Sequence, residues 1–272
     1  MSNFQVSPTR AELFVSAGGE QQFSLALTNH TGKSATFLLG AEDLGSASAQ
    51  QDDPVLLGNS AGSYSLKDYI LSTDSSVTLA DGETRSVPFV VRVPAGVTKP
   101  GLYGAVTIEL SGSSAREAVP GAIVRSRLAV PVLVRTVEKP DVSGHLIDFD
   151  TINGTHVLWS GKVILKVAYQ NDGNVHIEPT GLVSLSNFYG QQVSNERVGP
   201  IVILPMSVRS QTLSVSSGYM PGRFTALLQI EDGFGGHHEE QSLTLWILPW
   251  QTLLAVLVVF VIFILWRKVK KL

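Results

Sequence analysis

The chain has 272 residues and no cysteine, which allows one or two domains and excludes disulfide bridges, thiolate nucleophiles and cysteine-based metal sites. Charged residues make up only 16% of it, against roughly 25% in average soluble domains. Four of its 20 basic residues lie in the last six positions, which leaves 16 against 23 acidic residues and a net charge near −7 for the rest. This charge argues against nucleic acid as a partner.

The first half of the chain shows period-two alternation of apolar residues. The runs are Phe23–Leu27, Val87–Val93 and Leu128–Val134, and turn residues such as Asn29–Gly32 separate them. Pro131 inside the third run indicates an edge strand or a bulge. Short alternating runs between turns predict a β-sandwich or barrel.

The longest irregular stretch, Ala41–Ser65, is rich in Asp, Ser, Gly and Gln. Loops of this length are often functional, so we take the region as a candidate binding loop. Its aromatic residues would form a rigid contact patch, although core packing is an equal alternative for Tyr69. Its acidic residues, with Asp74 nearby, lack EF-hand spacing, so a solvated acidic loop is favoured over a calcium site. The candidate binding residues are Asp43, Asp52, Asp53, Tyr64, Asp68 and Tyr69.

The second half repeats the same style, with alternating runs at Val163–Tyr169 and Phe224–Ile230 and a tight turn at Asn171–Asn174. The short proline-bearing segment Glu138–Pro140 is a natural boundary between the halves. We therefore expect an all-β fold class with two tandem Ig-like β-sandwich domains. The membrane-distal domain would cover residues 1–138 and the membrane-proximal domain residues 139–246.

From Ile247 to Trp266 the chain has twenty residues without a charge, enough for a helix to span a bilayer of about 30 Å. Aromatic residues flank this span and a basic tail, residues 267–272, follows it. The positive-inside rule then places the tail in the cytoplasm and residues 1–246 outside. The expected membrane anchor consists of Trp246, Trp250, Trp266, Arg267, Lys268, Lys270 and Lys271.

The N-terminal sequence MSNFQVSPTR contains no apolar segment of the kind found in signal peptides. Either a signal peptide has been removed, or the chain is tail-anchored with its domains inside the cell. The basic tail favours the first alternative, and so a single-pass cell-membrane protein with an extracytoplasmic ectodomain.

Several segments resemble a known family. VSPTRAELFVSAGGEQQFSLALTN, running into FLLGAED, and later VAYQNDGNVHIEPTGLVSLSNFYGQQV, ILPMSVRSQTLSV and GRFTALLQI resemble WxL-interacting proteins, the DUF916-like group of bacterial cell-surface proteins. The resemblance implies attachment, with one domain engaging peptidoglycan or a surface protein and the other docking further partners. It transfers no ligand residue to a position in this chain.

Several catalytic motifs are lacking: the chain has no P-loop, no GxGxxG after a strand and no HExxH. The one metal-like cluster is His237–Glu240, but adjacent side chains of a strand point to opposite faces, so a solvated turn is favoured. His176, beside a hairpin turn, is expected to be a surface or hydrogen-bonding residue. We expect no enzyme activity, no metal and no cofactor.

Two functions from different classes follow from these patterns. The first is a membrane-anchored extracellular binding or scaffolding protein that attaches to a cell-wall polymer or to surface proteins. The alternative is a pilus or secretion assembly factor similar to a periplasmic chaperone, because the PTR start and a strand ending in Asn also resemble the first domains of pilus chaperones. Such chaperones are normally soluble with a basic cleft, so the anchor and the acidic ectodomain favour the first function.

Overall fold

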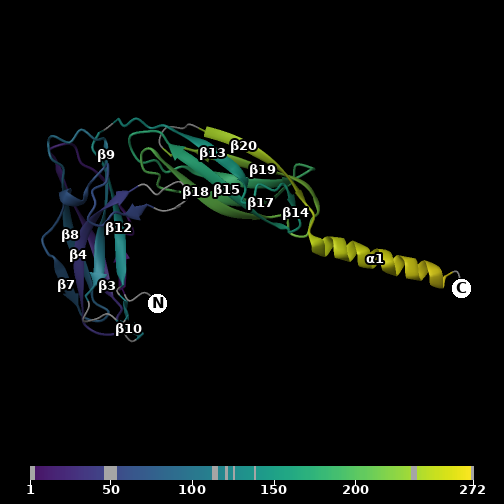
Figure 1. Cartoon of the computed structure of the whole chain (residues 1–272), viewed down its shortest axis with the longest axis horizontal. Coiled ribbons are helices and arrows are strands. Elements are labelled where there is room, and N and C mark those ends of the chain that lie inside the picture. The colour runs from purple at the N-terminus through teal and green to yellow at the C-terminus, as the bar shows by residue number, and fades with distance from the viewer. Residues whose placement is uncertain are drawn as a thin grey trace. The chain divides into compact units, whose positions relative to one another are not determined.

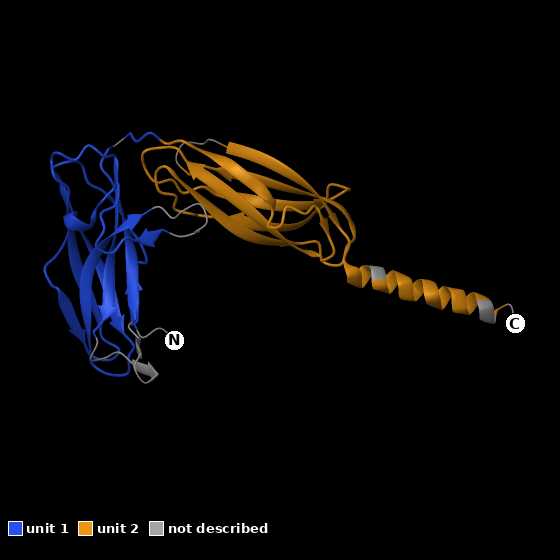
Figure 2. Ribbon diagram, in the orientation of Figure 1, with its two compact units in different colours: residues 1–47, 53–141 blue, residues 48–52, 142–272 orange. Residues whose placement is uncertain are grey.

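The computed structural model describes residues 4–45, 54–111, 116–119, 122–124, 126–137, 139–233 and 238–270. These residues are mostly β-strand, with one long apolar helix at the C-terminal end. The chain divides into two compact units, coloured separately in Figure 2, with the division between Asp141 and Val142. This lies three residues beyond the boundary expected from the sequence, and Glu138 itself is outside the described residues.

Unit 1 contains twelve strands and one turn of 3-10 helix, η1 (Lys67–Tyr69). Its strands are β1 (Phe4–Ser7), β2 (Ala11–Phe14), β3 (Glu20–Asn29), β4 (Ala35–Gly45), β5 (Val55–Leu56), β6 (Ile70–Ser72), β7 (Ser76–Leu79), β8 (Thr84–Arg92), β9 (Gly101–Leu110), β10 (Arg116–Val119), β11 (Ala122–Val124) and β12 (Arg127–Arg135) (Figure 1). One sheet has the order β1-β3-β8-β6 and the other β2-β12-β9-β4-β5, with β7 also paired to β4, while β10 and β11 form a separate hairpin.

The core of unit 1 follows from the period-two alternation. Leu25 and Leu27 of β3 are fully buried, as are the apolar residues of β8 such as Phe89. They belong to the same cluster as Ile108 of β9 and Val132 of β12 in the other sheet. Two sheets that share one core in this way form a β-sandwich. The strands expected around Phe23, Val87 and Leu128 are confirmed.

Unit 2 contains eight strands and the helix α1 (Trp250–Val269). Its strands are β13 (Gly144–Thr151), β14 (Val157–Leu158), β15 (Lys162–Asn171), β16 (Thr180–Asn187), β17 (Gln192–Val198), β18 (Ser207–Ser216), β19 (Gly222–Glu231) and β20 (His238–Ile247) (Figure 1). The sheets have the orders β13-β15-β18 and β14-β20-β19-β16-β17. Their inward residues, including Leu165, Leu213 and Leu228, form a second apolar core.

The same buried asparagine recurs in both units. Asn29 ends β3 and Asn171 ends β15, and both side chains are fully buried. Nδ2 of Asn171 donates to the carbonyl oxygens of Val175 and Ile203, both at 2.8 Å. Nδ2 of Asn29 likewise donates to the carbonyl oxygen of Lys33 in the following turn and to those of Leu79 and Ala80 at the end of β7. An amide that saturates several buried carbonyls fixes the turn after each strand.

The C-terminal helix begins later than the sequence indicated. Ile247 is still the last residue of β20, and α1 starts directly after Pro249. A proline before the first turn is favourable because it lacks the N–H that a helix start leaves unpaired. Residues Trp250–Arg267 have a mean hydropathy of 2.1 and are not buried. By length and composition this helix could cross a membrane, and it extends past Trp266 into the basic segment.

Candidate functional site

An open backbone edge of unit 1 lies along β12. Strand β2 runs parallel to β12 but pairs only with its second half, from Val132 to Arg135. On its other side β12 pairs with β9 along its whole length. The first half of β12, residues 127–131, therefore has no partner strand on the β2 side within the described chain. Arg127, Leu128 and Ala129 are exposed.

The direction of the free backbone groups follows from strand alternation. The carbonyl oxygen of Arg135 accepts a hydrogen bond from the backbone N–H of Val15, which continues from β2. Successive residues of a strand point their backbone groups to opposite sides. Because β12 pairs with β9 without a register shift, the odd-numbered residues Arg127, Ala129 and Pro131 also face the β2 side. Pro131 has no N–H to donate, consistent with β2 pairing only beyond it.

The first half of β12 thus offers two N–H groups and three carbonyl oxygens to an incoming strand. The side chain of Arg127 is held by an ion pair with Glu42 on β4, the strand beyond β9. Leu128 shares the core-facing side of β12 with Val130 and Val132, yet it is 38% exposed while they are buried. An added strand would therefore gain both backbone pairing and apolar contact.

Other sheet edges carry features that discourage strand addition. In unit 1, the edge strands β1 and β6 have only four and three residues. In unit 2, most of β20 is unpaired on one side, but its first residues are His238, Glu239 and Glu240. The carboxylate of Glu239 also takes the backbone N–H of Leu146 on β13. Short strands and charged residues are the usual protection of a sheet edge. The first half of β12 has a single charged residue, Arg127, and its charge is paired with that of Glu42.

Part of the candidate binding loop is regular structure of unit 1. Residues Ala41–Gly45 belong to β4 and Val55–Leu56 form β5, although the sequence predicted an irregular region there. Asp52 and Asp53 lie outside the described residues.

Asp43 is fully buried rather than available to a ligand. Its Oδ1 accepts the backbone N–H groups of Leu66 and Lys67, both at 2.9 Å, and its Oδ2 accepts that of Gly62 at 3.0 Å. Burial raises the pKa of this carboxyl, but hydrogen bonds from the Ser65 hydroxyl and the three backbone N–H groups outweigh it, so the pKa lies below its ordinary value of 3.8. Asp43 holds the connection into η1 in place.

The remaining loop residues do not converge on one site. The ring of Tyr64 packs against that of Tyr103 at 5.8 Å between centroids, with the Lys99 ammonium 4.8 Å from its centre. Tyr69 packs against the core of unit 1, as the core-packing alternative proposed. Asp68 is exposed in η1. These residues provide structure around Asp43 and no shared contact patch.

Of the metal-like cluster His237–Glu240, the last three residues begin β20, and His237 lies outside the described residues. Glu239 bonds across to β13, and the hydroxyl of Tyr169 donates to its Oε1 at 3.3 Å. Burial raises the pKa of Tyr169, and the negative charge of Glu239 beside it raises the pKa further. On the opposite side of the strand, the side chain of Gln229 donates to Glu240 at 2.7 Å. Adjacent members point to opposite sides, as a strand requires.

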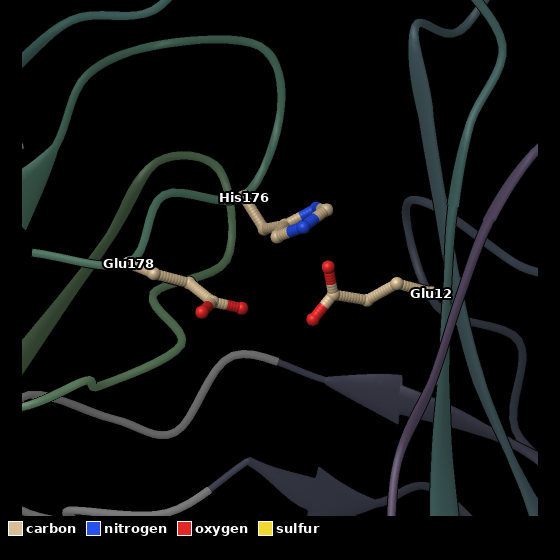
Figure 3. A group of neighbouring side chains, drawn as sticks. All are labelled: Glu12, His176 and Glu178. Atoms are coloured by element: carbon tan, nitrogen blue, oxygen red, sulfur yellow. The ribbon is translucent and has the colours of Figure 1, made fainter. Parts of the chain in front are cut away.

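His176 lies in the segment between β15 and β16 and is buried, with only 2% of its surface exposed. Figure 3 shows it with Glu178 of the same segment, and also labels Glu12, a residue of β2 in unit 1. His176 is therefore buried, which contradicts the surface position that was one of the two sequence-based expectations; a hydrogen-bonding role stays a prediction.

The expected anchor residues are placed at both ends of the helix region. Trp246 is on β20, Trp250 opens α1, and Trp266 and Arg267 lie within its last turns. The Lys270 ammonium lies 4.0 Å from the centre of the Trp266 ring. Lys268 belongs to α1, and Lys271 falls outside the described residues. The basic cluster thus continues the helix instead of forming a separate tail.

Comparison with known proteins gives no family assignment: no family model and no curated protein matches the chain. Several solved structures are similar in fold. One is a chain of the chaperone–tip adhesin complex of CFA/I fimbriae, with 10% sequence identity and a TM-score of 0.44 over 91% of this chain and 100% of that one. The chaperone YadV has 10% identity and a TM-score of 0.44 over 89% of this chain and 100% of its own. The E. coli chaperone DraB has 12% identity and a TM-score of 0.41 over 88% of this chain and 98% of its own. Similarity at this level carries no argument about function, and the resemblance to WxL-interacting proteins stays a hypothesis.

Proposed function

We propose that this chain is a membrane-anchored extracytoplasmic binding protein that captures a surface protein by strand addition at the first half of β12. The observation that carries the proposal is the open edge at residues 127–131 of β12, where the exposed Leu128 lies beside backbone groups without a partner strand. Unit 1 acts as an Ig-like recognition domain, unit 2 as an Ig-like spacer, and α1 retains both at the membrane.

The chemistry of the edge defines the class of partner. Backbone N–H and C=O groups recognise any extended segment, and the side chains at alternate positions supply the selectivity. On the core-facing side, the added strand meets Leu128, whose exposed surface favours an apolar residue in the partner. The partner segment is therefore an extended peptide with apolar residues at every second position, contributed by another protein.

The membrane arrangement in this proposal rests on charge and length. Helix α1 carries no charge from its start to Trp266, and the basic residues gather at its C-terminal end. Such asymmetry orients a single span with its basic end in the cytoplasm. Units 1 and 2 then face outward, where surface proteins of the kind implied by the resemblance to WxL-interacting proteins are found.

A chaperone-like role in assembly is the second candidate, and it uses the same edge. The exposed Leu128 on the core-facing side of an open strand suits an incomplete subunit that lacks a strand of its own. In this function the captured segment is handed on to a later partner, whereas a scaffold keeps it. The two differ in the lifetime of the complex.

The test uses the full chain in lipid nanodiscs and two variants at Ala129. Ala129→Pro removes an N–H from the open edge and adds a ring there, as Pro131 already does two residues on, without touching the β9 ladder. Ala129→Ser keeps the N–H and serves as the matched control. Each protein is incubated with solubilised envelope proteins of the source cell and, separately, with purified cell-wall fragments.

We expect wild type and Ala129→Ser, but not Ala129→Pro, to retain the same envelope protein, with slower amide exchange at Arg127 and Ala129 in the complex. The dissociation rate separates a lasting scaffold from a chaperone that releases its client. Equal retention by all three proteins, or retention of cell-wall fragments alone, would show that the β12 edge is not the binding site.

A further inference from the structure

The end of unit 2 that leads into α1 is built from four connections. The strand registers place Lys162 opposite Ser216, Asn187 opposite Phe224 and Gly222 opposite Ile247. Backbone N–H groups of Ser217, Leu248 and Trp250 donate to the carbonyl oxygens of residues 161, 158 and 159, so these pairs lie at the same end of unit 2 as the start of α1. The connections at this end are residues 152–161, 188–191, 217–221 and 248–249.

Large aromatic side chains gather on this end and are exposed. We call this set the helix-end patch, and its members are exposed by between 50% and 74%: Trp159, Phe188, Tyr189, Tyr219, Trp246 and Trp250. It contains three of the four tryptophans of the chain. Clusters of exposed aromatic residues are rare on a soluble surface and mark a contact with a protein or a membrane.

The patch is free of charge. None of the four connections contains Asp, Glu, Lys or Arg. The nearest charged residues on the flanking strands are Lys162, Arg223 and Asp150, and the Asp150 carboxylate is bonded to His156 at 2.9 Å. The opposite end of unit 2, by contrast, carries Asp172, Glu178 and Asp232 in its connections. Aromatic residues without charges, next to basic residues, suit the headgroup region of a bilayer.

Hydrogen bonds attach the patch to the first turn of the helix. The Thr252 hydroxyl donates to the carbonyl oxygen of Tyr219 at 2.5 Å, and the backbone N–H of Trp250 donates to that of Trp159 at 3.2 Å. The hairpin that carries Phe188 is joined to the same region, because Nδ2 of Asn187 lies 3.9 Å from the Met220 sulfur. The helix-end patch therefore lies level with the first turn of α1.

We propose that the helix-end patch is a membrane-docking surface that seats unit 2 in the outer headgroup region of the bilayer spanned by α1. This inference rests on the membrane-spanning part of the proposed function and is independent of the β12 edge. From Trp250 to Val269 the helix rises about 29 Å at 1.5 Å per residue, so its basic end reaches the opposite headgroup region while the patch occupies the near one.

A lipid surface is favoured over a protein partner by continuity with the helix. Any bilayer that surrounds α1 must begin where Thr252 bonds to Tyr219, so the aromatic loops meet it without a separate binding event. Tyrosine and tryptophan place an apolar ring and a polar N–H or O–H at this boundary. A second copy of the chain is the competing occupant that the experiment must detect.

The test measures the depth of single spin labels on the full chain in phosphatidylglycerol–phosphatidylcholine nanodiscs that each hold one protein. The chain has no cysteine, so single replacements are unambiguous. Gln191→Cys places a label in the patch hairpin, and Met206→Cys places one at an exposed position of the opposite end. Relaxation by oxygen reports the lipid phase and relaxation by a nickel chelate reports water.

We expect the nickel chelate to reach the label at 191 several-fold less than the label at 206. Adding Phe188→Ser and Tyr189→Ser should restore water-like accessibility at 191, with the circular dichroism spectrum and melting temperature of unit 2 unchanged. Equal accessibility at 191 and 206 would overturn the proposal. A second result would also overturn it: spin–spin broadening of the label at 191 in liposomes at high protein density, combined with water-like accessibility of that label in single-copy nanodiscs. The occupant of the patch would then be a second copy of the chain. Failure of the chain to enter bilayers at all would instead refute the proposed anchor.

Discussion

Replacing Asp43 by Asn tests whether this residue of the candidate binding loop stabilises the fold of unit 1. In wild type the two carboxylate oxygens accept three backbone N–H groups, from Gly62, Leu66 and Lys67. An asparagine of the same shape can keep its oxygen on two of them but must point its NH₂ at the third. One buried N–H then loses its acceptor, at about 1–3 kcal/mol, and the other two bonds lose their charge assistance.

The expected total is a loss of about 3 kcal/mol in the free energy of unfolding of unit 1. With an unfolding entropy of about 2.1 cal/mol/K per residue and about 130 residues, the melting temperature should fall by about 10 °C. The assay is thermal unfolding of the full chain in nanodiscs, with hydrogen exchange of peptides from residues 55–72 to localise the effect. Asp68→Asn, the same change on an exposed carboxylate, should alter stability by less than about 0.5 kcal/mol.

The pH dependence of the free energy of unfolding gives a second test of the Asp43 carboxylate. The pKa of Asp43 is lower in the folded chain than its ordinary 3.8, so its stabilisation is complete above that value and is lost as the pH falls through the folded pKa. The difference between wild type and Asp43→Asn should therefore narrow below about pH 4. An Asp43→Asn chain that melts like wild type, or a wild type that calcium stabilises through Asp43, would refute the structural assignment.

Three further predictions concern unit 2. Asn171→Asp replaces a donor by a carboxylate that faces two carbonyl oxygens, so calorimetry should show unit 2 losing about 3 kcal/mol or more while the transition of unit 1 stays in place. Because burial and Glu239 raise the pKa of Tyr169 above its ordinary 10.0, unit 2 should lose stability as the pH rises beyond that value, and Tyr169→Phe should flatten this slope in alkaline unfolding curves. A Cβ on Gly161 would lie 1.7 Å from the carbonyl oxygen of Gly218, so Gly161→Ala should cost about 1–3 kcal/mol, whereas Gly154→Ala, with open space around it, should cost only the strain of its positive φ.

The sequence predicted the positions of the strands, because these depend on the local alternation of apolar and polar residues. Alternation located the strands around Leu25, Phe89 and Leu165, because a half-buried strand repeats every two residues whatever its neighbours are. Pro131 correctly indicated an edge, since a proline cannot donate within a central ladder.

What could not be predicted depends on residues that meet only in the fold. The sequence alone indicates that Asp43 is an acidic loop residue. In the fold it belongs to β4, and its carboxylate accepts the backbone N–H groups of residues 62, 66 and 67. The start of α1 was misplaced because apolar residues that end a buried strand and apolar residues that begin a membrane helix have the same composition. The helix-end patch is spread over residues 159–250, and of its members only Trp246 and Trp250 stood out in the sequence, through their place beside the apolar span.

The short passage from β20 to α1 has a mechanical consequence. Only Leu248 and Pro249 separate the strand from the helix, and the N–H groups of Leu248 and Trp250 are bonded to the carbonyl oxygens of Leu158 and Trp159. A force applied to unit 2 has no slack tether to extend before it reaches α1. Tension would load the few hydrogen bonds between β14 and β20 in shear at the same time, and any rotation of unit 2 would turn the helix with it. In the proposed membrane arrangement, this joint would be a stiff coupling that transmits torque and tilt from unit 2 to the spanning helix.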